Sequence, residues 1–160
     1  MSKAFTREDD AVESTPLRPL PTLPPGVKNY ITASGAQALR AELANLENQR
    51  SSLATKDRSQ TSSLDQRIAR LEQILSSLTV VEPTPADEVR FGASVAVKYP
   101  SGDVEIFKIV GINEIDLDRN YISWQSPLAK ALTNAKVGDV VRFRAPAGEQ
   151  RLEILSIEFK

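Results

Sequence analysis

The sequence predicts an α+β protein, in which an N-terminal antiparallel helical hairpin is followed by an antiparallel β domain with one short helix. Leucine and isoleucine recur every three or four positions over residues 30–82, which is the spacing of a helical seam. Over residues 91–160 the pattern changes to short stretches of alternating apolar residues, separated by turns rich in proline and glycine. Runs of helix followed by runs of strand are typical of the α+β class.

The first helical arm is expected to begin after Thr32, whose hydroxyl can accept a hydrogen bond from the free amides of the first turn. Its apolar seam consists of Leu39, Leu43, Leu46 and Leu53. Arg50 occupies the one seam position that is not apolar, where its aliphatic stem can lie along the seam. The polar stretch that follows, residues 55–63, predicts the turn of the hairpin.

The second arm has the clearer seam, which consists of Leu64, Ile68, Leu71, Leu75 and Leu78. Ser62 or Ser63 is expected to cap its start, and Pro83 ends any helical continuation. Arms of about 17–22 residues project roughly 25–33 Å at 1.5 Å per residue. A two-helix hairpin has a narrow apolar interface, so its root is expected to pack on the second domain.

In the second region, Val95 and Val97 are predicted to lie on one face of the first of four to five antiparallel strands. Ser126 and Pro127 predict the start of a short helix, because serine caps it and proline lacks an amide that would be unsatisfied there. Phe107 is expected in the core. Trp124 is expected either in the core or as an exposed anchor for a partner.

Two segments are expected to lie outside these domains. Residues 1–29 hold five of the ten prolines and an acidic stretch, which predicts a disordered or polyproline-like tail. Residues 83–90, rich in proline and acidic residues, are expected to link the hairpin to the β domain.

Composition narrows the chemistry that the chain can perform. The 160 residues include no cysteine and no histidine, which excludes thiolate chemistry, the serine triad and the commonest metal ligands. The formal net charge of −1 does not favour direct binding of nucleic acid. Neither a secretory signal nor an apolar run of the ~18 residues that cross a bilayer is present in the sequence, which predicts a soluble, cytoplasmic protein.

Two ordered sets of motifs resemble a known family. In the first region they are Ile31-Thr32, Gly35, Leu39, Glu42-Leu43 and Leu46. In the second region they are Phe91-Gly92-Ala93, Val95, Ile109-Val110-Gly111, Glu114-Ile115, Tyr121-Ile122-Ser123, Ser126-Pro127-Leu128-Ala129, Ala131-Leu132, Val137-Gly138-Asp139 and Pro146-Ala147-Gly148-Glu149. Over residues 30–160 the chain resembles the GreA/GreB transcription elongation factors, and is closer to the GreB side.

The resemblance implies a coiled-coil hairpin over 30–82 and an FKBP-like domain over 91–160. In the family that domain docks at the rim of the secondary channel of RNA polymerase, and two acidic residues at the hairpin tip help to hold a catalytic Mg²⁺. The docking contact corresponds here to Ser126, Pro127 and Leu128, beside Gln125, which stands where the GreB type has an aspartate. A neutral amide in place of the carboxylate predicts a weaker contact.

The hairpin tip departs from the family pattern. It offers a single acidic residue, Asp57, between Lys56 and Arg58, so the local charge is net positive and disfavours a divalent cation. We interpret this tip as a solvated turn, with a contact to nucleic acid in the polymerase complex as the alternative. Relative to the family, a shortening of about nineteen residues removes roughly 14 Å of reach at 1.5 Å per residue.

These observations predict a monomeric, non-enzymatic Gre-type factor that binds RNA polymerase, uses no cofactor or metal, and modulates elongation or initiation without stimulating transcript cleavage. A general interaction module of the FKBP-like or Rnk-like type is the alternative. A peptidyl-prolyl isomerase is a third hypothesis by fold analogy alone, and an aromatic content of 6% disfavours the pocket that such an enzyme needs.

Overall fold

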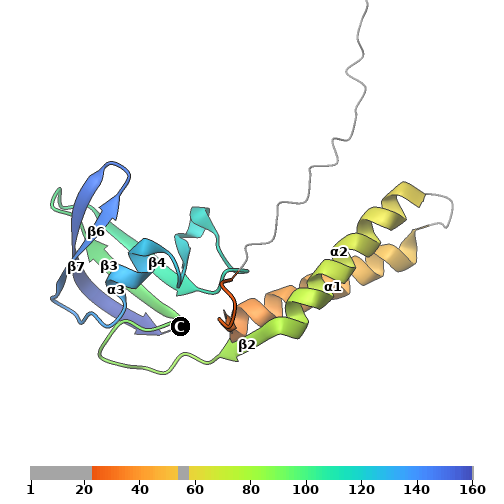
Figure 1. Cartoon of the computed structure of the whole chain (residues 1–160), viewed down its shortest axis with the longest axis horizontal. Coiled ribbons are helices and arrows are strands. Elements are labelled where there is room, and N and C mark those ends of the chain that lie inside the picture. Colours follow the sequence, from red (N-terminus) through yellow and green to blue (C-terminus); the bar gives the residue numbers. More distant parts are fainter. Residues whose placement is uncertain (1–22, 54–57, 160) are drawn as a thin grey trace, which may run out of the picture.

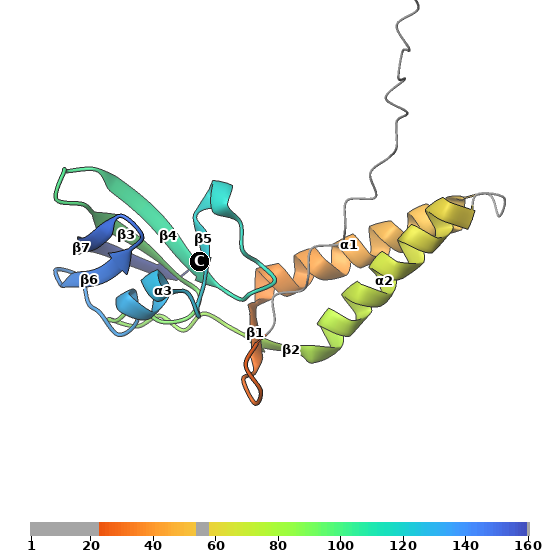
Figure 2. The same cartoon turned by 45° about the horizontal axis from the view of Figure 1, so that its top comes forward.

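A computed structural model describes residues 23–53 and 58–159 and shows a helical hairpin that projects from a sheet domain (Figure 1). In both views the hairpin lies on one side of the molecule and the larger sheet on the other (Figure 2). The predicted α+β class is confirmed. None of the helices in the described ranges is long and apolar enough to cross a membrane.

The hairpin consists of two 20-residue helices, α1 (Ala33–Ser52) and α2 (Arg58–Ser77). The predicted seam is confirmed over most of its length: Leu46, Leu64 and Leu71 are buried between the helices. Partly buried apolar residues pack around them, namely Leu39, Leu43, Leu53 and Ile68. The apolar stripe is narrow, so both helices leave most of their surface to solvent.

The predicted start of α1 is confirmed and that of α2 is wrong. Thr32 is the N-cap of α1, and its hydroxyl accepts a hydrogen bond from the amide of Gly35 at 3.1 Å. By contrast, Ser62 and Ser63 lie inside α2, which already begins at Arg58. Serine is only a moderately poor helix former, so packing against α1 can extend the helix through this polar stretch.

A short parallel strand pair closes the root of the hairpin, and it was not predicted. Strand β1 (Asn29–Thr32) pairs with β2 (Leu78–Val81), so that Ile31 lies opposite Val80. Leu78 therefore belongs to a strand and not to the helical seam. The β-branched residues at both ends of the hairpin favour this extended pairing.

The sheet domain contains five strands in the order β5-β4-β3-β7-β6. Their bounds are Ala93–Lys98 for β3, Val104–Val110 for β4, Tyr121–Ser123 for β5, Val140–Ala145 for β6 and Gly148–Phe159 for β7. All neighbouring pairs are antiparallel except β4 and β5, which run parallel.

The parallel pair corrects the prediction of a purely antiparallel sheet. After β4 the chain passes through a 3₁₀ helix, η1 (Leu117–Arg119), and returns before it enters β5. Asn120 takes the left-handed conformation, with a φ of 57°, and ends η1 directly before the strand. Asparagine tolerates this region better than most residues, so the turn back is encoded locally.

The core of the sheet domain lies between the sheet and the short helix α3 (Pro127–Leu132). Val95 and Val97 are fully buried on one face of β3, as predicted, and Phe107 also belongs to the core. Val89 is fully buried as well, and its backbone exchanges hydrogen bonds with Ala135 and Asn134. The end of the 83–90 segment therefore packs with the sheet domain.

Candidate functional site

The predicted start of α3 is confirmed at the segment proposed for docking. The hydroxyl of Ser126 accepts a hydrogen bond from the amide of Ala129 at 3.2 Å, and Pro127 follows at the first helical position. The amide of Ser126 donates to the carbonyl of Ser123 at 2.9 Å, which turns the chain out of β5. The backbone at this corner is thus held on both sides.

The four predicted docking residues lie together but differ in exposure. Pro127 is exposed, whereas Gln125 and Ser126 are partly buried. Leu128 is also partly buried and packs against the core of the sheet domain. The amide of Gln125 donates to the hydroxyl of Ser123 at 3.1 Å. Pro127 is thus the most exposed of the four, while Ser126 caps α3 and Leu128 packs against the core.

Trp124, for which the sequence left two roles open, is partly buried and packs against the sheet-domain core. Its ring meets that of Tyr30 edge-on, with 5.2 Å between the ring centroids, and Tyr30 also lies 6.0 Å from the ring of Phe91. Trp124 belongs to the apolar residues that pack against the sheet-domain core. Aromatic pairs of this geometry add to the energy of burial, so Trp124 ties the hairpin root to the sheet.

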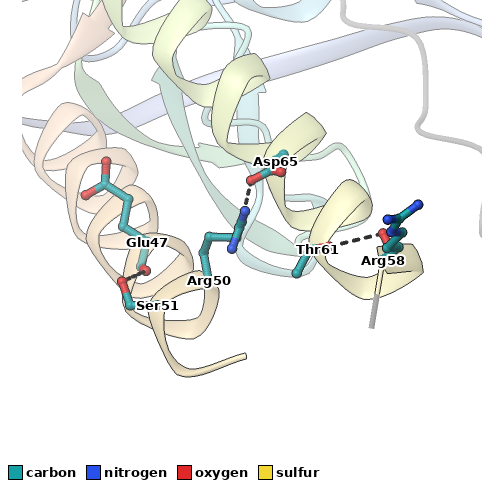
Figure 3. A network of polar contacts seen from close by, with 6 residues as sticks. All are labelled: Glu47, Arg50, Ser51, Arg58, Thr61 and Asp65. Atoms are coloured by element: carbon teal, nitrogen blue, oxygen red, sulfur yellow. Dashed lines mark hydrogen bonds and ion pairs between the residues drawn. The ribbon is translucent and has the colours of Figure 1, made fainter. Parts of the chain in front are cut away.

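Only part of the predicted hairpin tip falls within the described residues. Lys56 and Asp57 lie outside them, and Arg58 opens α2 with an exposed side chain. The hydroxyl of Thr61 donates to the backbone carbonyl of Arg58 at 3.1 Å (Figure 3). This bond lies within the first turn of α2.

An ion pair crosses between the helices close to this end of the hairpin. Arg50 on α1 points toward Asp65 on α2, and its Nε lies 2.7 Å from Oδ1 of the aspartate (Figure 3). The sequence predicted that the aliphatic stem of Arg50 lies along the seam. Its guanidinium reaches the surface, where it pairs with Asp65 and both side chains are about half exposed. A pair between two arms depends on their register, so the sequence alone offered no signal for it.

The remaining carboxylates of the hairpin do not gather into a metal site. Glu42 lies 3.9 Å from Arg67 across the two helices, a second and looser ion pair. Within residues 23–53 and 58–159, no group of three or more acidic side chains is placed to hold a metal ion. The described part of the hairpin thus carries ion pairs between its helices and no acidic cluster of that kind.

Glu114 makes contacts that the sequence pattern did not predict. Its Oε2 accepts hydrogen bonds from the amides of Thr32, at 3.0 Å, and Gly111, at 2.8 Å. Its Oε1 accepts a further bond from the hydroxyl of Thr32. The carboxylate therefore sits at the start of α1 although it belongs to the sheet domain. Thr32 and Glu114 are 82 positions apart in the sequence, which explains why no local pattern predicted the contact.

Comparison with known proteins shows which family the sequence matches. A family model described as "Transcription elongation factor, GreA/GreB, C-term" matches residues 84–159. The transcription elongation factor GreB of Neisseria meningitidis serogroup B is 38% identical over 154 residues, covering 82% of this chain and 94% of that protein. GreB of Pseudomonas aeruginosa is 36% identical over 150 residues, covering 81% and 89% of the two chains.

Two further matches are more distant or shorter. The transcription elongation factor GreA of Acidiphilium cryptum is 41% identical over 105 residues, covering 64% of this chain and 67% of that protein. Among solved structures, the GreA factor homolog Gfh1 of Thermus thermophilus covers 82% of this chain and 99% of its own, with 24% identity and a TM-score of 0.42. The family assignment rests on the sequence matches.

Proposed function

This chain belongs to the GreA/GreB family of transcription elongation factors, and on that premise we propose that it binds RNA polymerase near the secondary channel and modulates transcription without stimulating transcript cleavage. The sheet domain would dock through the Gln125–Leu128 corner. The hairpin would then enter the channel partway.

The observation that carries the second half of this proposal is the charge of the hairpin tip. Between Leu53 and Leu64 the sequence holds one acidic residue, Asp57, with a basic residue on either side. Asp65, the next carboxylate along α2, is already neutralised by Arg50 at 2.7 Å. A Mg²⁺ ion prefers several oxygen ligands, and a net positive tip disfavours its approach.

The geometry of the α3 start supports the docking half of the proposal. Pro127 is exposed at a corner whose backbone is held by the Ser126 cap and by Ser123. A rigid corner loses little conformational entropy when a partner binds it. Gln125 beside it keeps hydrogen-bonding capacity but carries no charge, which weakens contact with a basic partner.

Binding can be tested by competition for core RNA polymerase between this chain and a GreB-type factor. We expect mutual displacement at micromolar concentration. Gln125→Asp should tighten binding roughly threefold to tenfold, as a partly exposed charge-assisted contact would. Ser156→Asp adds the same charge at an exposed position on β7 and serves as the matched control. Absence of binding for both the parent and Gln125→Asp would contradict the proposal and favour a general interaction module.

Cleavage is tested separately with a backtracked elongation complex assembled from purified polymerase. We expect no shortening of the transcript above the rate of polymerase alone, at protein concentrations that saturate binding. A GreB-type factor added to the same complex is the positive control, and its activity should fall as this chain displaces it. Stimulated cleavage by the chain itself would refute the role of the tip given above.

A further inference from the structure

We propose that Glu114 is a positioning residue that fixes the direction in which the hairpin leaves the sheet domain. The geometric part of this inference concerns the free protein. Its consequence for transcription rests on the proposed function, since the direction of the hairpin determines where the tip lies once the sheet domain has docked.

The contacts of Glu114 join the two parts of the molecule through one carboxylate. The amide and the hydroxyl of Thr32, at the root of the hairpin, both donate to it. The amide of Gly111, on the loop after β4, donates to the same Oε2 atom at 2.8 Å. Hydrogen bonds to an ionised acceptor are among the stronger ones in proteins. Thr32 itself is only 4% exposed, which shields the contact from water.

Two glycines show how closely the parts approach each other. A Cβ atom on Gly35 would lie 1.9 Å from Oε1 of Glu114, and one on Gly111 would lie 1.9 Å from the carbonyl oxygen of Tyr30. Neither glycine has a positive φ, so space and not backbone conformation explains the residue type. We call the contact between the hairpin root and the sheet domain around Glu114 the joint. Because the joint is tightly packed, few alternative arrangements of its residues fit.

The carboxylate of Glu114 lies among hydrogen-bond donors at the positive end of α1. It accepts from Thr32, the N-cap of α1, beside the free amides that carry the positive end of the helix dipole. The neighbouring contact across the joint is neutral, with the side-chain amide of Asn29 donating to Asn113 at 3.0 Å. Among the bonds that the structure gives at this joint, those to Glu114 are therefore the charge-assisted ones, and they should dominate its stiffness.

The length of the hairpin converts a small change at the joint into a large displacement at the tip. A helix of 20 residues is about 30 Å long at 1.5 Å per residue. A tilt of roughly 10° at the root therefore moves the far end by roughly 5 Å. Such a displacement is larger than a hydrogen bond, so loss of the joint would misplace the tip even with docking intact.

The test measures the distance between the two parts in the free, full-length protein. The chain has no cysteine, so spin labels can be attached at Ser62→Cys on α2 and Ser156→Cys on β7, both exposed positions. Double electron–electron resonance should give one narrow distance distribution for the parent. Glu114→Ala should broaden it, with alternative orientations rising roughly tenfold in population for each charge-assisted bond lost.

Three further variants distinguish positioning from general damage. Glu114→Gln keeps the size of the side chain and should broaden the distribution less than Glu114→Ala. Gly35→Ala keeps glutamate at position 114, but the added methyl group displaces its carboxylate. This variant should therefore broaden the distribution as well. Glu105→Ala removes an exposed carboxylate that contacts Tyr99 within the sheet domain, and should leave the distribution unchanged. Circular dichroism of each variant verifies that it is folded, and Glu114→Gln replaces Glu114→Ala if the latter is not.

An unchanged distribution in both Glu114→Gln and Gly35→Ala would overturn the inference, whatever the result with polymerase. If the distribution broadens, a second measurement tests the consequence. Glu114→Gln should then keep the polymerase affinity of the parent in the competition assay and lose its effect on transcription. Failure of the parent to bind polymerase would refute the proposed function, while the distance measurement would still decide the role of Glu114.

Discussion

At the scale of single residues, Tyr99 shows how one contact alters a titration. Tyr99 follows β3, and its hydroxyl donates to Oε2 of Glu105 at 2.9 Å. Burial of the phenol raises its pKa from 10.0 to about 12, and the hydrogen bond and negative charge of Glu105 act in the same direction. Both effects disfavour the tyrosinate form.

This shift predicts how stability changes in alkali. In the unfolded chain Tyr99 loses its proton near pH 10, whereas the folded protein holds it until about pH 12. Its contribution to the free energy of unfolding is therefore complete below pH 10 and is lost between pH 10 and 12. Urea unfolding of the parent and of Tyr99→Phe should show a smaller fall for the variant across that window. Parallel curves through pH 12 would contradict the assignment.

Residue-scale predictions from the sequence succeeded where the partner is local. Thr32 and Ser126 were correctly identified as caps, because a cap and its amide are three residues apart. The ion pair between Arg50 and Asp65 was not predicted, and the contacts of Glu114 were missed. Those contacts join residues from different elements, so they depend on register and on tertiary packing that no local pattern contains.

At the scale of elements, the hairpin depends on a small apolar core. Leu46 is 2% exposed and lies at the centre of the cluster with Leu64 and Leu71. A two-helix interface has few other buried residues with which to compensate a cavity. The hairpin should therefore respond to core truncation more strongly than its exposed, polar surface would indicate.

We expect Leu46→Ala to destabilise the hairpin by about 2–5 kcal/mol, the usual cost of truncating a buried leucine. Asn48→Ala, at an exposed position of the same helix, should change stability by no more than about 0.5 kcal/mol. Hydrogen exchange of the α1 and α2 amides is the measurement, because it separates the hairpin from the sheet. Equal protection in the two variants would show that the seam does not hold the helices together.

Most elements followed from periodicity, and the exceptions have physical causes. Alternation predicted β3, and the Ser-Pro pair predicted α3. The strands β1 and β2 were missed because four-residue extended segments next to helices carry no alternation of their own. The parallel direction of β5 depends on the path of the chain through η1, and a strand pattern does not encode direction.

At the scale of the whole molecule, the hairpin root and the sheet domain share an aromatic contact. Tyr30, on β1, packs against Trp124 and Phe91, both of which lie against the core of the sheet domain. Trp124 is the only tryptophan in the chain. Its fluorescence therefore reports on the joint, whereas helical circular dichroism reports mainly on α1 and α2.

We expect the two signals to change together when the parent is unfolded, because a shared interface couples the parts. In Tyr30→Ala they should separate, with helical signal lost at lower denaturant concentration than the loss of native Trp124 fluorescence. Tyr121→Ala, on β5, is the control: it removes a ring whose centroid lies 5.3 Å from the ammonium of Lys108, and should leave the joint unaltered. Separate transitions in the parent, or coincident ones in Tyr30→Ala, would argue against coupling through this contact.

The parallel pairing of β1 with β2 has a consequence for how such hairpins diverge. The chain enters and leaves the helical arms at adjacent points that are held together independently of the arms themselves. Seven residues added to or removed from each arm preserve the seam and change the length by about 10 Å. The pairing of β1 with β2 and the sheet domain would be unchanged. Insertions and deletions of whole heptads can thus change how far the hairpin projects without changing its root.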